Sequence, residues 1–402
     1  MRLAIVTSYP PSKVTLNEYA YHLVKHFRQH QDLTELILLT DTSENEADIA
    51  FEEAGCKVVV KQCWKFNSMT NIFSVLKAIN QTKPEAILFN LQFMKFGDKK
   101  IAAALGLILP FLCKLKQIPT IVLLHNILEQ VDLDKAGFSK NRISQFLYTR
   151  IGKLLTRFIL QADKVAVTIS KYVDILKMEY DADHVVLIPH GTFELPEAPN
   201  FNKDLKTLKV MTFGKFGTYK KVETMIEAVV DVRERTGANL EIVIAGTDNP
   251  NVPGYLDEVK KQYSHISGLT FTGYVAEEDV PRLFEESAMV VFPYTSTTGS
   301  SGVLHQAGSY GKAVVMPDLG DLGILVREEG YRGEFFNPES KESMADAIEK
   351  IAMNKSYRNQ LERANYKAAT AYPMSKITDM YIDVFKEISS EKYEISQEKV
   401  SF

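Results

Sequence analysis

The stretch "KVMTFGKFGTYKKVETMIEA", residues 209–228, decides the fold class. It begins with an apolar run typical of a buried strand and passes through a turn with two glycines. It then shows apolar residues at helical spacing, which predicts a helix that starts near Lys220. A strand, a tight turn and a helix in this order form the unit from which parallel sheets covered by helices are built.

The same alternation of short apolar runs and helical patterns continues in both directions. Predicted strands before this stretch include "RLAIVTS", "ELILLT", "EAILFN", "PTIVLLHN" and "HVVLIPHG", and later ones include "LEIVIAG", "LTFTGYV" and "MVVFPY". Residues 192–206 are rich in Pro and Asn and lack apolar periodicity, which predicts a linker. We therefore expect two doubly wound α/β domains of the Rossmann type, facing a cleft in which parallel sheets of this kind bind their ligands.

The expected domain limits follow from the linker and from a proline near the C-terminus. Residues 1–195 form the first predicted domain and residues 196–375 the second. Pro373 should split the last two helices, because proline cannot continue a helix. The predicted final helix, residues 376–402, is expected to return to the first domain.

Composition excludes several classes of protein. The 402 residues are 45% hydrophobic and 24% charged, as in ordinary globular proteins, and the net charge of -4 argues against nucleic acid as a partner. The three cysteines are odd in number and lack histidines at zinc-site spacing, so we expect thiols in a reducing compartment. The N-terminal apolar run is too short for a secretory signal, so a cytoplasmic location is predicted.

The turn in the opening stretch carries chemistry suited to a diphosphate. Lys215 and Lys220 flank it, and Gly214 comes at the end of the predicted strand. Ammonium groups beside backbone amides at a strand-to-helix junction can stabilise a diphosphate both when bound and when departing. The alternative interpretation of the same residues is a solvated loop that carries lysines.

A second stretch, "STTGSSGVLHQAGSYGKAVV", residues 296–315, favours the diphosphate. A helix is predicted to begin at Ser301 or Gly302 after a serine cap, which leaves its first amides free for an anion. Gly299 and Gly302 let the backbone approach a ligand closely. Gln306 lies one turn further, within reach of the ribose of a nucleotide whose phosphates bind at the helix start. A capped helix that only packs into the core is the alternative.

These motifs, in this order, resemble glycosyltransferase family 4, which comprises retaining enzymes of the GT-B architecture that use nucleotide sugars. The resemblance covers nearly the whole chain. "GKFGTYKK" resembles the Gly-Arg-Leu segment of the family with its following lysine, so that Lys215 stands at the arginine and Lys220 at the lysine. "QAGSYGKAVV" resembles the segment Glu-Ala-Met-Ala-x-Gly-x-Pro-Val-Val. The donor-binding residues that this implies are Gly214, Thr298, Gly299, Ser300, Ser301, Gly302, Val303, Gln306 and Tyr274.

The chain departs from the family at its paired glutamates, which contact the donor sugar and the ribose. Thr298 and Gln306 occupy these two positions. A neutral hydrogen bond contributes about 1 kcal/mol, against roughly 1.5 to 3 kcal/mol for a charged one, so weaker donor binding is expected unless neighbouring hydroxyls compensate. Three hypotheses follow: an enzyme with a modified donor site, a GT-B subunit without catalysis, and a sugar-nucleotide 2-epimerase.

The resemblance also assigns roles in the first domain. His125 ends the strand "PTIVLLHN", where the family has a histidine close to the donor sugar, and Asn126 follows it on the acceptor side. A structural histidine is the alternative. Glu18 stands where the family has an acid after paired glycines, but Thr15 and Leu16 replace those glycines. We therefore expect this loop to shape the acceptor pocket rather than to bind phosphate.

The expected partners follow from the same reasoning. The donor should be a UDP-sugar or GDP-mannose, and the acceptor a glycan or a lipid-linked molecule of the cell envelope. No metal and no other cofactor is expected, because lysines and helix amides can neutralise the diphosphate. Residues 139–161 are predicted to form a basic amphipathic helix without acids, which is typical of attachment to anionic lipid, or else of a core helix with a solvated basic face.

Overall fold

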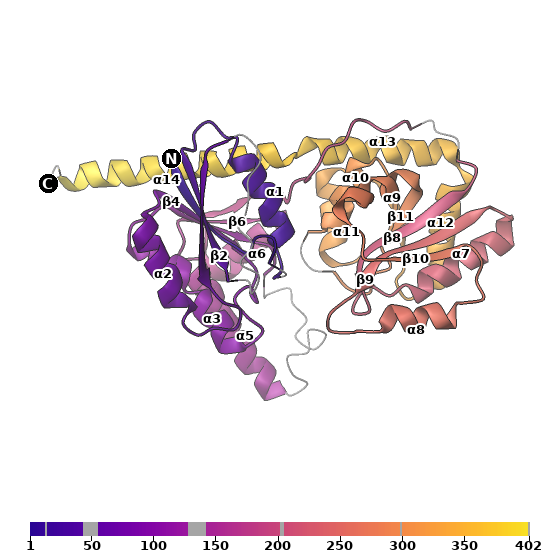
Figure 1. Cartoon of the computed structure of the whole chain (residues 1–402), viewed down its shortest axis with the longest axis horizontal. Helices are drawn as coiled ribbons and strands as arrows, with labels where there is room; N and C mark the ends of the chain where they lie inside the picture. Colours follow the sequence, from indigo (N-terminus) through magenta and orange to yellow (C-terminus); the bar gives the residue numbers. More distant parts are fainter. Residues whose placement is uncertain (13, 43–54, 128–141, 202–204, 298–299, 401–402) are drawn as a thin grey trace. The chain divides into compact units, whose positions relative to one another are not determined.

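The computed structural model describes residues 1–402 except residue 13 and the ranges 43–54, 128–141, 202–204, 298–299 and 401–402. At 142–149 and 393–400 it describes the helical backbone alone. The chain divides into two compact units, one formed by Met1–His190 with Met374–Phe402 and the other by Gly191–Pro373 (Figure 1). Each unit contains one parallel sheet surrounded by helices, so the predicted architecture of two Rossmann-like α/β domains is confirmed.

The first unit contains a seven-stranded sheet in the order β3-β2-β1-β4-β5-β6-β7. Its elements are β1 (Arg2–Val6), α1 (Asn17–Phe27), β2 (Glu35–Asp41), β3 (Lys57–Trp64), α2 (Asn71–Thr82), β4 (Ala86–Leu91), α3 (Lys100–Gly106), α4 (Leu109–Leu115), β5 (Thr120–Leu124), α5 (Arg142–Ile159), β6 (Lys164–Val167), α6 (Ser170–Tyr180), β7 (Val185–Leu187) and α14 (Met374–Val400). The strand order reverses between β1 and β4, which is where sheets of this type bind ligands beyond the carboxyl ends of their strands.

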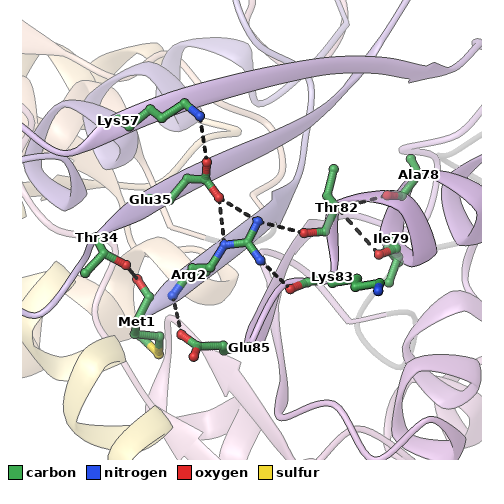
Figure 2. Close-up of polar contacts among 10 residues, drawn as sticks. All are labelled: Met1, Arg2, Thr34, Glu35, Lys57, Ala78, Ile79, Thr82, Lys83 and Glu85. Carbon is green, nitrogen blue, oxygen red and sulfur yellow. Dashed lines mark hydrogen bonds and ion pairs between the residues drawn. The ribbon is translucent and has the colours of Figure 1, made fainter.

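Ion pairs link neighbouring strands at the opposite, amino-terminal edge of this sheet. The Arg2 guanidinium donates to the Glu35 carboxylate at 2.7 Å and to the carbonyls of Thr82 and Lys83, as Figure 2 shows. Lys57 reaches the same carboxylate at 3.3 Å. The hydrogen bond from Arg2 holds the pKa of Glu35 below its ordinary value. These charges join β1, β2, β3 and the end of α2, so they have a structural role.

The last helix, α14, belongs to the first unit, as the sequence predicted. It lies beside α1 (Figure 1). Tyr381 packs against Phe27 with a ring-centroid distance of 6.2 Å. Lys386 pairs with Asp32 at 2.7 Å. The predicted break at Pro373 is confirmed, because the preceding helix ends at Ala371 and α14 begins at Met374.

The second unit contains a six-stranded sheet in the order β10-β9-β8-β11-β12-β13. Its elements are β8 (Leu208–Phe216), α7 (Glu223–Thr236), β9 (Leu240–Asp248), α8 (Tyr255–Gln262), β10 (Leu269–Gly273), the short 3-10 helix η2 (Glu277–Asp279), α9 (Val280–Glu286), β11 (Ser287–Val291), α10 (Gly302–Ser309), β12 (Ala313–Pro317), α11 (Gly320–Glu329), β13 (Gly333–Phe336), α12 (Lys341–Met353) and α13 (Lys355–Ala371). Here the strand order reverses between β8 and β11.

In residues 209–228 the structure differs from the prediction at one boundary, the start of the helix. Strand β8 continues to Phe216, because β9 is equally long and pairs with it as far as Asp248. Helix α7 therefore begins at Glu223 and not near Lys220. The backbone at Lys220 pairs instead with Tyr294, in the segment that follows β11.

Candidate active site

The loops after β8 and β11 are joined at the point where the second sheet reverses its strand order. The amide of Lys221 donates to the carbonyl of Pro293 at 3.0 Å, and the amide of Thr295 donates to the carbonyl of Tyr219 at 2.8 Å. These two segments are far apart in the sequence and adjacent in space because β8 and β11 are neighbouring strands. They place Lys220 beside the residues that lead into α10.

Lys220 is a buried cation at this junction. The residue is 8% exposed, and its Nζ lies 4.8 Å from the centre of the Tyr294 ring. Gly214 makes room for it, because a Cβ built at that glycine would lie 2.6 Å from Nζ. Within the described ranges, no hydrogen bond or ion pair is made by this ammonium. Burial lowers the pKa of Lys220, with a smaller opposing effect of Tyr219. A buried cation of this kind favours an anionic ligand.

The start of α10 supplies free amides close to this cation. Ser301 caps the helix by accepting a hydrogen bond from the Leu304 amide at 3.4 Å, so the predicted cap and helix start are confirmed. The amides of Gly302 and Val303, in the first turn, have no partner in the part of the chain that the structure describes. Tyr294 connects the two groups, because its ring lies under the Lys220 ammonium and its phenol is hydrogen-bonded to Ser301. The cation and the helix start therefore meet through Tyr294, an arrangement that suits an anion.

The other residues expected to bind the donor differ in burial and in hydrogen bonding. Gln306 is half-buried one turn into α10, and its side-chain amide makes no hydrogen bond to any described residue. Ser300 is half-buried just before the cap. Lys215 is exposed and lies in β8, in register with Thr247 of β9. Thr298 and Gly299 lie outside the described residues.

Tyr274, another expected donor residue, lies at the edge of the second sheet. It follows β10, the edge strand, and β9 separates that strand from β8. Its side chain is 83% exposed. Tyr294 was not predicted from the sequence, although a signal was present, since this tyrosine directly follows the apolar run "MVVFP".

In the first unit, His125 lies in an aromatic cluster at the carboxyl edge of the sheet. Its ring packs edge-on against Tyr19 of α1 at 4.6 Å, and Tyr19 packs in turn against His190 at 4.8 Å. His125 Nε2 is 2.7 Å from Oδ1 of Asn90, which is in β4. Burial lowers the pKa of His125 well below its ordinary value, and the charges of His190 and Lys95 act in the same direction. The ring is therefore neutral at neutral pH.

The two acceptor-side residues lie near this cluster in the sequence but differ in exposure. Asn126 is half-buried, and its Oδ1 has no hydrogen-bond partner among the described residues. Glu18 is exposed in the first turn of α1. Leu16, which replaces a family glycine, has a φ of 70°, the left-handed conformation that glycine adopts most readily. The backbone here thus has the glycine conformation without the glycine.

Lys95 is a further residue that sequence reasoning missed. Its side chain is fully buried, and its Nζ donates to Ser8 Oγ at 2.5 Å and to the carbonyl of Thr15 at 2.9 Å. Burial lowers the pKa of Lys95 to about 7, while the carboxylate of Asp41 acts in the opposite direction. The ammonium joins the end of β1 to the loop before α1, and no local sequence pattern indicates it.

The described ranges contain no group of three or more His, Cys, Asp or Glu side chains placed to hold a metal ion. No described helix is both long and apolar enough to cross a bilayer.

Comparison with known proteins identifies the class. Residues 207–354 match the family described as Glycosyl transferases group 1. No curated protein matches the sequence at a significant level. Among solved structures, sucrose-phosphate synthase from Thermosynechococcus elongatus superposes with a TM-score of 0.72 at 15% identity, covering 97% of this chain and 99% of that one. Anabaena HepE in complex with UDP and glucose gives 0.67 at 16% identity, covering 96% and 100%.

A third solved structure, WaaG, a glycosyltransferase involved in lipopolysaccharide biosynthesis, gives a TM-score of 0.65 at 13% identity, covering 95% of this chain and 99% of that one. The predicted GT-B fold is therefore confirmed over nearly the whole chain. The match to the glycosyl transferases group 1 model lies within the second unit, and the expected enzyme class, a glycosyltransferase, is confirmed.

Proposed function

We propose that the chain is a retaining glycosyltransferase of the family 4 type, which moves a hexose from a nucleoside diphosphate sugar to a glycan or lipid-linked acceptor. The observation that carries the proposal is the Lys220 ammonium, buried without a described counter-anion beside the free amides of α10. A diphosphate neutralises this cation when bound, and it is stabilised there when it leaves.

The proposed roles of the other residues follow from their places. The amides of Gly302 and Val303 donate hydrogen bonds to the phosphate oxygens, and Gln306 binds the ribose. Lys215 adds positive charge from the solvent side. The departing phosphate takes the proton of the acceptor, as the family resemblance implies. A UDP-sugar is the favoured donor, because HepE, which shares the fold, was solved with UDP and with UDP-glucose. GDP-mannose is the other donor to test.

Two alternative functions are a scaffold without catalysis and an epimerase. A GT-B scaffold without catalysis is favoured by the neutral residues Thr298 and Gln306 at the positions of the family glutamates. A sugar-nucleotide 2-epimerase would use the same diphosphate surface. Lys220 and the free helix start favour a nucleotide-binding protein over a scaffold, since a scaffold gains nothing from an uncompensated buried charge.

The products formed from UDP-glucose, UDP-N-acetylglucosamine and GDP-mannose test this proposal. We expect nucleoside diphosphate release that depends on an added envelope glycan or lipid-linked acceptor, because transfer requires both substrates. Isomerised nucleotide sugar would indicate an epimerase. If none of these nucleotides at millimolar concentration binds or raises the melting temperature, the diphosphate site is refuted.

The lipid-linked acceptor has a second line of support in α5. Ile151 and Leu154 are 42% and 52% exposed on this helix, and Arg157 is exposed on the same turns. Lys153 is paired with Glu179 of α6 at 2.9 Å, which reduces the free positive charge of the helix. Exposed apolar side chains beside cations suit the surface of an anionic membrane, and we propose that α5 attaches the enzyme to the inner membrane face.

Co-sedimentation with anionic liposomes measures this attachment. Arg157→Glu should weaken binding about 5- to 30-fold, because each basic residue near an anionic surface contributes about 1 kcal/mol and the substitution also adds a repulsive charge. Lys260→Glu, an exposed charge reversal on α8 of the second unit, is the matched control and should bind like the unchanged protein. Equal loss in both variants, or no binding at all, would contradict an α5 attachment site.

A further inference from the structure

A chain of hydrogen bonds leads from the end of β1 to the imidazole of His125. The Thr7 hydroxyl donates to the carbonyl of Ser8 at 3.0 Å. The side-chain nitrogen of Asn90 donates to the Thr7 oxygen at 3.0 Å, and Asn90 Oδ1 lies 2.7 Å from His125 Nε2. Thr7, Ser8 and Asn90 are buried at the reversal point between β1 and β4, and His125 directly follows β5, the next strand of the sheet.

The direction of each bond in this chain follows from the one before it. A carbonyl can only accept, so the single hydroxyl proton of Thr7 points at Ser8. The Thr7 oxygen must then accept, which turns the NH2 group of Asn90 toward it. Asn90 Oδ1 therefore faces the histidine, and an acceptor in that position requires a proton on Nε2.

We propose that Asn90 is a positioning residue for His125, which holds the ring proton on Nε2 and thereby keeps the Nδ1 lone pair available to accept a hydrogen bond from a hydroxyl of the reacting sugar. No described residue bonds to Nδ1, and the ring is half-buried. The inference rests on the proposed function for its substrate, but the ring tautomer can be measured without one. A ring held in this form recognises a hydroxyl and not a phosphate oxygen, because Nδ1 has no proton to donate.

The other groups around the ring cannot replace Asn90. Tyr19 of α1 packs edge-on, His190 lies 6.2 Å away between ring centres, and Lys95 is engaged with Ser8 and Thr15. Among the described residues, Asn90 makes the one side-chain hydrogen bond to this imidazole. Its loss should leave the tautomer unfixed.

Nitrogen NMR of the full-length protein labelled in histidine tests the tautomer directly. His125→Gln identifies the signal among the eight histidines. In the unchanged protein we expect a protonated Nε2 and an unprotonated Nδ1. Asn90→Ala should give a mixture of both tautomers, and Asn90→Asp should restore the proton on Nε2 because the carboxylate also accepts. A proton on Nδ1 in the unchanged protein, or the same tautomer in Asn90→Ala, would overturn the proposal.

Turnover provides a second measurement, because a purely structural role of Asn90 would not change kcat and its pH profile in the way described here. Asn90→Ala should lower kcat on the order of tenfold with little change in the KM for the donor, as a wrong tautomer affects the reaction and not nucleotide binding. Asn90→Asp should recover kcat and move its acidic limb to higher pH, since a nearby negative charge raises the pKa of a histidine. Failure of Asn90→Asp to do either would contradict the assignment.

Two further variants keep the test decisive. Asn80→Ala, at an exposed position of α2, should change neither the tautomer nor kcat. If Asn90→Ala does not fold, Thr7→Val takes its place, because it removes the oxygen that orients the amide while keeping the side-chain shape. A protein without any turnover contradicts the proposed function alone, since the NMR measurement needs no substrate.

Discussion

Lys220→Met is expected to lower kcat/KM for the nucleotide sugar about 10²- to 10³-fold, the usual loss when one preorganised group that stabilises the leaving oxygens is removed. Methionine keeps an unbranched side chain, one atom shorter, beside Gly214 and Tyr294 and removes the ammonium with its charge and its hydrogen-bond donors. The effect should be large because the ammonium is shielded from water, where its attraction to a diphosphate is strong. Steady-state kinetics and calorimetric titration with UDP measure it.

Lys221→Met is the matched control for this variant. Lys221 is the next residue, but its ammonium lies 4.7 Å from the centre of the Tyr255 ring and not beside Tyr294. We expect UDP affinity and turnover close to those of the unchanged protein. If both lysines matter equally, general positive charge and not a specific site explains the binding.

The pH dependence of UDP affinity, compared between the unchanged protein and Lys220→Met, distinguishes an effect of the Lys220 charge from an effect of packing. Burial lowers the pKa of Lys220, so the free protein loses this proton at a lower pH than an ordinary lysine does. UDP should bind best below that lowered pKa and more weakly as the pH rises through it. Between this lowered pKa and the ordinary lysine pKa, the unfolded chain binds more protons than the folded chain. In that pH range the contribution of Lys220 to the free energy of unfolding therefore rises with pH. Lys220→Met should lose both effects.

Truncation of the chain after Pro373 is expected to unfold the first unit. This is the second prediction with a large effect. This change removes α14, which contributes six side chains that are at most 1% exposed: Met374, Ile377, Tyr381, Ile382, Phe385 and Ile388. At about 1.5 to 3 kcal/mol each, they account for roughly 9 to 18 kcal/mol, an upper estimate that is as large as the whole stability of a typical domain.

Tryptophan fluorescence measures this loss in the first unit alone. The chain has a single tryptophan, Trp64, which is 1% exposed at the end of β3. After truncation its emission should shift to that of a solvated indole, while helical circular dichroism from the second unit still melts cooperatively. A control chain ending at Lys392 keeps the 2.8 Å ion pair of that residue with Asp163 and should fluoresce like the full chain. A buried Trp64 in the shorter chain would contradict the expectation.

Much of the architecture could be read from local patterns. Apolar runs of strand length predicted the buried strands, and Ser301 with the following periodicity predicted the start of α10. Pro373 predicted the last helix break. These predictions succeeded because each depends on the conformational preferences of neighbouring residues. The predicted helix start near Lys220 was wrong for the opposite reason, since the hydrogen bond of Lys221 to Pro293 competes with the helix.

The sequence alone determined the fold class, the glycine-rich turns and the residue types able to bind a diphosphate. Only the tertiary structure decided which of them meet. Strand order places β11 beside β8 and β4 beside β1, and so brings Tyr294 to Lys220 and Asn90 to Thr7, 83 residues apart. Leu16 shows the same dependence, because surrounding contacts and not its own preference hold it at a φ of 70°. Sheet order is a property of the whole chain, whereas a local pattern reports only on its neighbours.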